Sequence, residues 1–76
     1  MSIYDVFFTP SEQTGEDLQA SLHIHSDGRK TWKNSKEWKS FYCSDEEKRL
    51  IEEAVERYPH QESFPIGLCT VKLRRP

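Results

Sequence analysis

The residues with the clearest chemical pattern lie in residues 29–42, where cations alternate with aromatic rings. Five cations fall within eleven residues: Arg29, Lys30, Lys33, Lys36 and Lys39. Four rings lie among and just after them: Trp32, Trp38, Phe41 and Tyr42. Rings that stack on bases and cations that contact phosphates are what single-stranded nucleic acid binding requires. Aromatic side chains are equally the usual anchors of protein interfaces.

The same pattern also has a structural explanation. Lysines on an exposed edge strand prevent pairing with another sheet, and tryptophans fill a core. As a binding surface, the segment would have Trp38, Phe41, Lys36 and Lys39 at its centre. The binding residues predicted on this basis are Arg29, Lys30, Lys33, Lys36, Trp38, Lys39, Phe41 and Tyr42.

Charge is segregated along the chain. The 76 residues carry a formal net charge of −2 and have a pI of about 5.9. Residues 1–18 contain four acids and no base, and residues 44–57 contain six acids and three bases. Dedicated nucleic-acid modules are usually basic overall, whereas separated charge suits steering toward a protein partner. We therefore predict a small non-enzymatic regulatory or adaptor protein that binds another protein through residues 29–42. The alternative is single-stranded nucleic acid or RNA binding through the same segment.

His23 and His25 form the second pattern with chemical potential. Alternation in a strand places both imidazoles on one face, where a third ligand such as His60, Cys43 or Cys69 would complete a zinc site. No CxxC or HxxxH spacing accompanies them, so we expect solvated strand histidines and no metal.

Catalysis has little support beyond residue types. Cys43 directly precedes a predicted helix, whose N-terminus can lower a thiol pKa, but the position equally suits a buried apolar residue. The three glycines are isolated, so no loop is suited to phosphate binding. We expect no enzyme and no cofactor. No apolar run approaches the ~20 residues of a membrane span, and the N-terminus lacks a signal-peptide pattern. The expected setting is the cytoplasm, with Cys43 and Cys69 as reduced thiols.

The expected secondary-structure elements that position these residues indicate one small α+β domain spanning residues 1–76. The pattern predicts a mainly antiparallel sheet in β-β-β-α-β order with one helix packed on one face. The expected strands are 2–8, 17–25, 29–34 and 68–74, and the expected helix is 44–58. The strand at 2–8 is apolar on both faces, which favours an interior position. Residues 60–67 are expected to be a loop, and the periodicity of residues 35–42 fits either a helix or a strand.

Two details of side-chain placement follow from the pattern. Residues 17–25 alternate, with one set expected on the core face (Leu18, Ala20, Leu22 and Ile24) and the other on the polar face (Gln19, Ser21, His23 and His25). A three-residue loop at 26–28, with a left-handed Gly28, would set Trp32 opposite Leu22.

The predicted helix has both a start signal and an apolar stripe. Ser44 and Glu47 have capping-box spacing, and Pro59 ends the helix. The stripe expected to pack on the sheet comprises Leu50, Ile51, Ala54, Val55 and Tyr58.

The apolar side chains outnumber what one such helix can cover. Exposed apolar patches often mark interfaces. We therefore expect a homodimer with Trp38 or Phe41 near the seam and with Lys36 and Lys39 at its rim.

Overall fold

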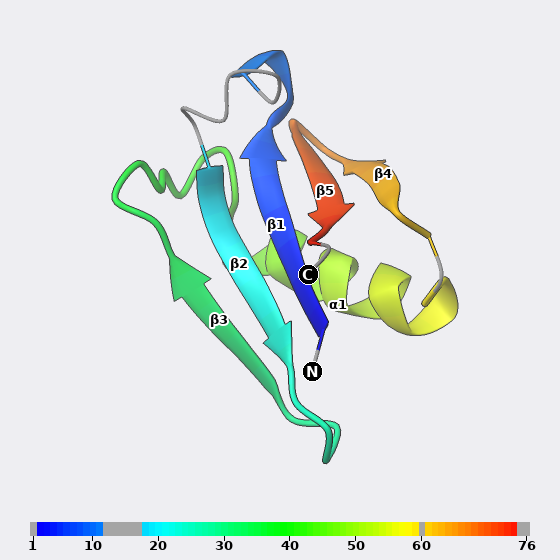
Figure 1. The fold of residues 1–76 in the computed structure, drawn as a ribbon. Coiled ribbons are helices and arrows are strands. Elements are labelled where there is room, and N and C mark those ends of the chain that lie inside the picture. The colour runs from blue at the N-terminus through cyan, green and yellow to red at the C-terminus, as the bar shows by residue number, and fades with distance from the viewer. Residues whose placement is uncertain (1, 12–17, 60, 75–76) are drawn as a thin grey trace.

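The structure is a computed structural model that describes residues 2–11, 18–59 and 61–74. These ranges form five strands, one α-helix and a short 3-10 helix: β1 (Ser2–Phe8), η1 (Thr9–Ser11), β2 (Leu18–Ile24), β3 (Lys30–Asn34), α1 (Asp45–Arg57), β4 (Ser63–Ile66) and β5 (Cys69–Leu73). The strands form one antiparallel sheet in the order β3-β2-β1-β5-β4, and α1 packs on one face of it (Figure 1). The predicted α+β class is confirmed.

One strand was missed by the sequence pattern. β4 lies within residues 60–67, which were expected to be a loop, so that expectation was wrong. β4 is an edge strand of four residues that pairs only with β5. It contains Pro65, which has no N–H to donate and is tolerated at a sheet edge but not in its centre. The element order is therefore β-β-β-α-β-β.

β1 lies at the centre of the sheet, as its two apolar faces predicted. Val6 pairs with Ala20 of β2 on one side and with Val71 of β5 on the other. Tyr4 and Val6 are buried in the core beneath the sheet. Alternation then turns Ile3, Asp5 and Phe7 to the other side, which we call the open face because α1 does not cover it (Figure 1).

β2 contains an irregularity that changes the face of one side chain. Ala20 pairs with Val6, but Leu18 pairs with the very next residue, Phe7, which leaves Gln19 as the extra residue of a bulge. Leu18 therefore joins the open face, and Gln19 is fully buried with 0% exposure. Both had been expected on the opposite sides, and the bulge is the reason that this expectation was wrong.

The hairpin between β2 and β3 has the predicted register. Leu22 pairs with Trp32, and Gly28 adopts a φ of 93°. The Gly28 amide donates to the His25 carbonyl over 2.9 Å, and the His25 amide donates to the Arg29 carbonyl over 2.8 Å. The three-residue loop thus sets Trp32 on the helix side of the sheet.

α1 begins and ends close to the predicted residues but buries a narrower stripe. The Ser44 hydroxyl accepts from the Glu47 amide over 3.3 Å, which caps the helix. Ile51 and Val55 are the buried helix residues, whereas Leu50 and Tyr58 are 52% and 54% exposed. The expectation that all five stripe residues pack on the sheet was therefore wrong.

Residues 35–44, here called the connecting segment, link β3 to α1 through a series of turns and are neither helix nor strand. Gln19 fixes this segment from below. Its side-chain amide donates to the Glu37 carbonyl over 3.1 Å and accepts from the Lys39 amide over 2.7 Å. The buried bulge of β2 thus gives the connecting segment a defined path.

The core lies between the sheet and α1. Its buried apolar residues are Tyr4, Val6, Ala20, Leu22, Cys43, Ile51, Val55, Cys69 and Val71. No helix in the described ranges is long and apolar enough to cross a membrane.

Candidate functional site

The structure distributes the basic-aromatic residues over separate surfaces. Arg29 and Lys30 are both engaged within the chain. Arg29 Nε lies 2.9 Å from Asp27 Oδ2 in the β2–β3 turn, and Lys30 Nζ lies 2.5 Å from Glu56 Oε1 on α1. These two predicted binding residues therefore have local partners, of which Lys30 and Glu56 join the edge strand to the helix.

The two tryptophans also serve the fold. Trp32 Nε1 donates to Glu52 Oε1 over 3.2 Å, and Trp38 Nε1 donates to the Cys43 carbonyl over 3.0 Å. The Lys48 ammonium lies over both rings, 5.5 Å from the Trp32 centroid and 5.2 Å from the Trp38 centroid. Both rings are half-buried against the core, which leaves Trp38 less available to a partner than the sequence indicated.

Phe41 and Tyr42 belong to a cluster at one end of the sheet. Tyr42 stacks on Phe8, the last residue of β1, with 4.1 Å between ring centroids, and Phe41 lies against Tyr42 at 4.2 Å. Leu68, in the β4–β5 turn, lies at the same end because its carbonyl accepts from the Thr9 amide over 3.0 Å. We call Phe8, Phe41, Tyr42 and Leu68 the aromatic end. Phe41 is 68% exposed and Leu68 is 52% exposed.

Lys36 and Lys39 lie on the connecting segment that leads to Phe41. Both are exposed, and within the described residues neither ammonium group has a side-chain partner. Glu37 is the acid between them. These two lysines therefore keep their charge available to solvent or to a partner.

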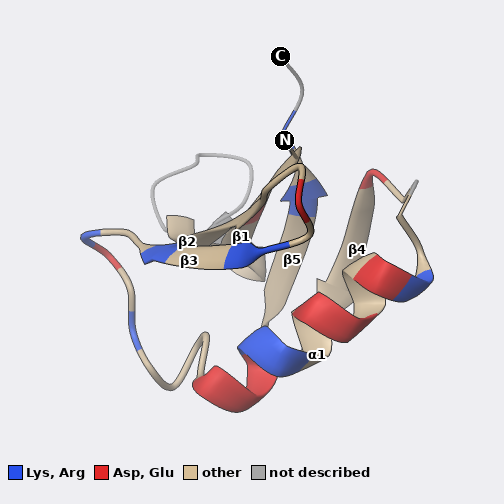
Figure 2. Ribbon diagram, turned by 90° about the horizontal axis from the view of Figure 1, so that it is seen from below, with Lys and Arg blue, Asp and Glu red and all other residues tan. Residues whose placement is uncertain are grey.

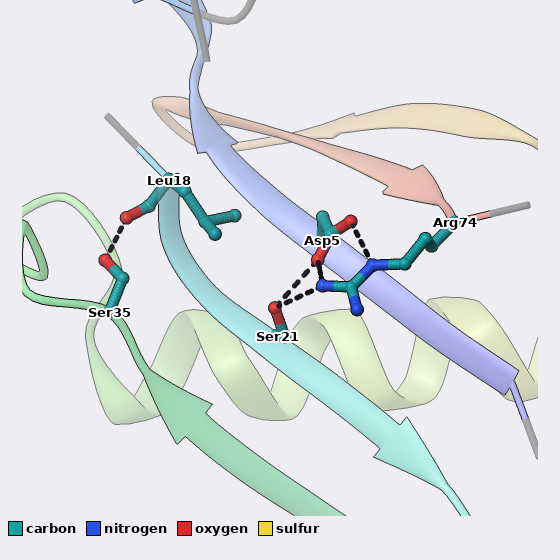
Figure 3. A network of polar contacts seen from close by, with 5 residues as sticks. All are labelled: Asp5, Leu18, Ser21, Ser35 and Arg74. Atoms are coloured by element: carbon teal, nitrogen blue, oxygen red, sulfur yellow. Dashed lines mark hydrogen bonds and ion pairs between the residues drawn. The ribbon is translucent and has the colours of Figure 1, made fainter. Parts of the chain in front are cut away.

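Lys33 points elsewhere, onto the open face of the sheet. It lines a shallow pocket of about 240 Å³. The lining residues come from β2, from β3 and from the residues that directly follow β3 and β5: Leu18, Ser21, His23, Lys33, Asn34, Ser35 and Arg74. The hydroxyl of Ser35, one of these lining residues, donates to the Leu18 carbonyl (Figure 3).

A polar network crosses the open face beside this pocket (Figure 3). Arg74 binds Asp5 through two atoms, Nε to Oδ2 over 2.9 Å and Nη2 to Oδ1 over 2.6 Å. The Ser21 hydroxyl donates to Asp5 Oδ1 over 2.7 Å. Burial of Asp5 acts to raise its pKa, but the hydrogen bonds from Arg74 and Ser21 outweigh burial and hold that pKa below its ordinary value.

The histidines do not form a metal site with described residues. His23 lines the pocket, and His25 Nε2 lies 3.0 Å from the Thr31 hydroxyl. Among the described residues no three His, Cys, Asp or Glu side chains are grouped to hold a metal ion. His60, considered above as a third ligand, lies outside the described residues.

The two cysteines, 26 positions apart in sequence, meet in the core. Both are free thiols with 0% exposure. Cys69 Sγ donates to the Tyr42 carbonyl over 3.0 Å. A hydrogen bond between the two thiols is the main cause of a raised pKa for Cys69 and a lowered pKa for Cys43. No pattern in the sequence indicated this proximity, because it depends on where β5 lies in the sheet.

Several residues of these surfaces were not singled out from the sequence, notably Phe8, Leu68, Ser21 and Arg74. Alternation in residues 68–74 could have placed Lys72 and Arg74 on one face, but not beside Asp5. Comparison of the chain with protein-family models, curated proteins and solved structures found no match.

Proposed function

We propose that the protein is a non-enzymatic adaptor that binds another protein through the aromatic end. The observation that carries this proposal is the 68% exposure of Phe41, a large ring held at a fixed place on the surface. Leu68 adds a second exposed apolar side chain at the same end. Buried aromatic anchors supply most of the affinity in many protein interfaces.

The contacts that hold Tyr42 beside Phe41 favour binding, because they reduce the side-chain entropy that is lost when a partner binds. The Tyr42 ring stacks on Phe8 of the central strand, and the Tyr42 carbonyl accepts the hydrogen bond from Cys69. Phe41 is therefore bonded directly to Tyr42, a residue whose ring and backbone are both held in place. Ordering a side chain at an interface costs about 0.5–1.5 kcal/mol, and a pre-positioned ring avoids part of that cost.

The charge beside the aromatic end indicates the chemistry of the partner. Lys36 and Lys39 are exposed and lack side-chain partners among the described residues. Charges at the rim of an interface mainly increase the association rate and select a complementary partner. The expected partner therefore presents an apolar pocket for Phe41 with acidic side chains around it.

The test is capture of the partner by immobilised protein, followed by comparison of matched variants. Phe41→Ala should abolish capture. Tyr58→Ala should retain it, because Tyr58 is a similarly exposed ring that caps the C-terminus of α1 and does not belong to the aromatic end. Circular dichroism should show that both variants are folded. Undiminished capture by Phe41→Ala and Leu68→Ala would exclude the aromatic end.

A second copy of the chain is the competing occupant of the same surface. Sedimentation equilibrium at micromolar concentration distinguishes the two. A mass near the 9.0 kDa of one chain supports a different protein as partner. Twice that mass, restored to one chain by Phe41→Ala, would assign the aromatic end to a homodimer.

A further inference from the structure

We propose that the open face of the sheet is a second binding site, which contacts the phosphates of single-stranded nucleic acid. This site is distinct from the aromatic end and does not depend on it. It uses one predicted binding residue, Lys33, together with residues of β1, β2 and β5 that are remote from it in sequence.

The cations of this site are aligned by the strand register. Lys33 pairs with Ser21, Ser21 with Asp5, and Asp5 with Lys72. Directly paired residues share a face, so these side chains form one row across four strands, which we call the cross-strand row. Lys33 and Lys72 stand at its ends, and Arg74 reaches its centre through Asp5.

Arg74 forms an ion pair with Asp5 and covers it, so that Lys33 and Lys72 supply the net positive charge of the row. The side chain of Asp5 is 14% exposed, whereas that of Arg74 is 46% exposed. The carboxylate binds the guanidinium from below through two contacts and fixes its orientation (Figure 3). A ligand approaching the open face therefore meets Arg74 before it meets Asp5.

Polar side chains line the pocket beside the cross-strand row, and the hydroxyl protons of Ser21 and Ser35 are donated within the chain to Asp5 and to the Leu18 carbonyl. Ser21, Asn34 and Ser35 line it together with His23 and Lys33. Such side chains are the ones that, with Arg and Lys, contact phosphate oxygens in nucleic-acid complexes. The volume of about 240 Å³ is below the range of about 300–1,000 Å³ typical of pockets that enclose whole small molecules. It suits one phosphate of a longer strand.

The open face also offers apolar contact to bases. Ile3 and Phe7 of β1 lie half-buried on this face, and Phe7 pairs with Leu18 at the pocket. Single-stranded ligands combine phosphate contacts with stacking of bases on aromatic rings. A sheet face that carries an aromatic ring near cations, here Phe7, is one of the established ways to bind RNA.

Among the described residues, the element with the most acids is α1, in the other layer. α1 carries six of the acids, Asp45, Glu46, Glu47, Glu52, Glu53 and Glu56. In Figure 2 their red bands lie on the helix below the sheet, while blue bands mark β3 and the end of β5. A net charge of −2 is therefore compatible with a locally positive open face, since binding responds to the local field.

The exposure pattern favours nucleic acid over a protein for this face. Among the described residues the large hydrophobic side chains that are exposed are Phe41, Leu50, Tyr58 and Leu68. None of them lies on the open face, so this face lacks the protruding apolar anchor that protein interfaces use. Affinity here must come mainly from phosphate contacts.

The experiment is a titration of a fluorescent single-stranded 12-mer at 50 and 200 mM salt. Contacts from Lys33, Lys72 and Arg74 predict a log–log salt slope of about −2, which corresponds to an affinity loss on the order of 20-fold between the two salt concentrations. Lys33→Gln and Lys72→Gln should each weaken binding and each reduce the slope by about 0.7. Arg49→Gln removes the same charge from α1 and should leave binding unchanged.

Three results would overturn the proposal. These are no binding at 50 mM salt, an equal loss of affinity with Arg49→Gln, and equally tight binding of a poly-glutamate peptide. Loss with Lys36→Gln but not with Lys33→Gln would also overturn it, because the contact would then lie on the connecting segment. Phe41→Ala should retain oligonucleotide binding, which separates failure of this site from failure of the aromatic end.

Discussion

At the scale of single residues, Asp5 joins strands that are distant in sequence, because it accepts hydrogen bonds from Ser21 of β2 and from Arg74 beyond β5. Asp5→Asn should lower the free energy of unfolding at pH 7 by about 1 kcal/mol, since it removes a charged acceptor that is mostly shielded from solvent. The folded-state pKa of Asp5 is lowered, so its stabilisation is present above the unfolded pKa of about 4 and is lost as pH falls through the folded value. Urea denaturation at pH 7 and pH 2.5 checks this.

The stability difference between wild type and Asp5→Asn should be smaller at pH 2.5 than at pH 7. Ser63→Ala, on the exposed surface of edge strand β4, provides a control that should follow the wild type at both pH values. A difference between wild type and Asp5→Asn that stays constant with pH would contradict an ionic role for this carboxylate.

Gly67 shows how close one backbone position lies to the half-buried carboxylate of Glu47. A Cβ at Gly67 would fall 2.9 Å from Glu47 Oε2, and Gly67 has a φ of 57°. Burial raises the pKa of Glu47. Gly67→Ala should therefore destabilise the protein by about 1–3 kcal/mol, from backbone strain plus the clash with Glu47. Thermal or urea unfolding of the variant measures this loss.

A double-mutant cycle separates the two causes. In a Glu47→Ala background the loss caused by Gly67→Ala should shrink by at least about 0.5 kcal/mol, because the clash is gone. Gly28→Ala is the matched control: its φ is 93°, but its Cβ would meet nothing within 4 Å. Its loss should be the same in both backgrounds. Equal losses for Gly67→Ala in both backgrounds would refute the steric contribution.

At the scale of elements, α1 stabilises the sheet through a narrow stripe. Ile51 is fully buried and Leu50 is 52% exposed, although both belonged to the predicted apolar stripe. Ile51→Val should cost about 1 kcal/mol, because it removes a methylene from a packed core. Leu50→Ala should cost less than about 0.5 kcal/mol, since an exposed helix position tolerates Ala well. Urea unfolding of both variants is the measurement. A larger loss of stability for Leu50→Ala than for Ile51→Val would contradict the orientation of α1, in which Ile51 faces the core and Leu50 faces solvent.

The elements also show how far the sequence determined the fold. Local signals sufficed for α1, with its Ser44 cap, and for the β2–β3 hairpin, where Gly28 fixed Trp32 opposite Leu22. Two features could not be predicted from local sequence, because they depend on contacts between distant strands. The bulge at Gln19 arises from pairing with β1, and β4 is recognisable only from the strand beside it.

The candidate sites follow the same division. The sequence located Phe41 and Lys33 within one segment, but the turn of the chain after β3 sends them to different surfaces. The partners of Lys33 come from strands that pair across the whole chain, such as Asp5 with Lys72. Pattern within a segment identifies candidate side chains, whereas only strand order identifies which of them act together.

At the scale of the whole molecule, charge and apolar surface are separated. Among the described residues, α1 carries six acids, Lys36 and Lys39 lie on the connecting segment, and Lys33 lies on the open face. Figure 2 shows the acidic bands of the helix below the sheet. The exposed ring of Phe41 lies at the end of the sheet. Two ligands could therefore bind at once. Saturating oligonucleotide should leave capture of a protein partner unchanged, and a competition experiment with the captured complex measures this. Displacement of the partner by the oligonucleotide would show that the two surfaces overlap.

The central position of β1 has a consequence for the order of folding. Tyr4 pairs with Leu73 and Phe8 with Cys69, so β1 is synthesised well before β5, the strand that completes its pairing. Until then one side of β1 presents unpaired N–H and C=O groups, which favour association with other chains. Pairing at such long sequence separation also slows folding. A fragment of residues 1–60 should therefore aggregate alone and recover a defined fold when a peptide of residues 61–76 supplies the missing hairpin. A soluble, folded fragment without the peptide would show that the nascent chain is protected in another way.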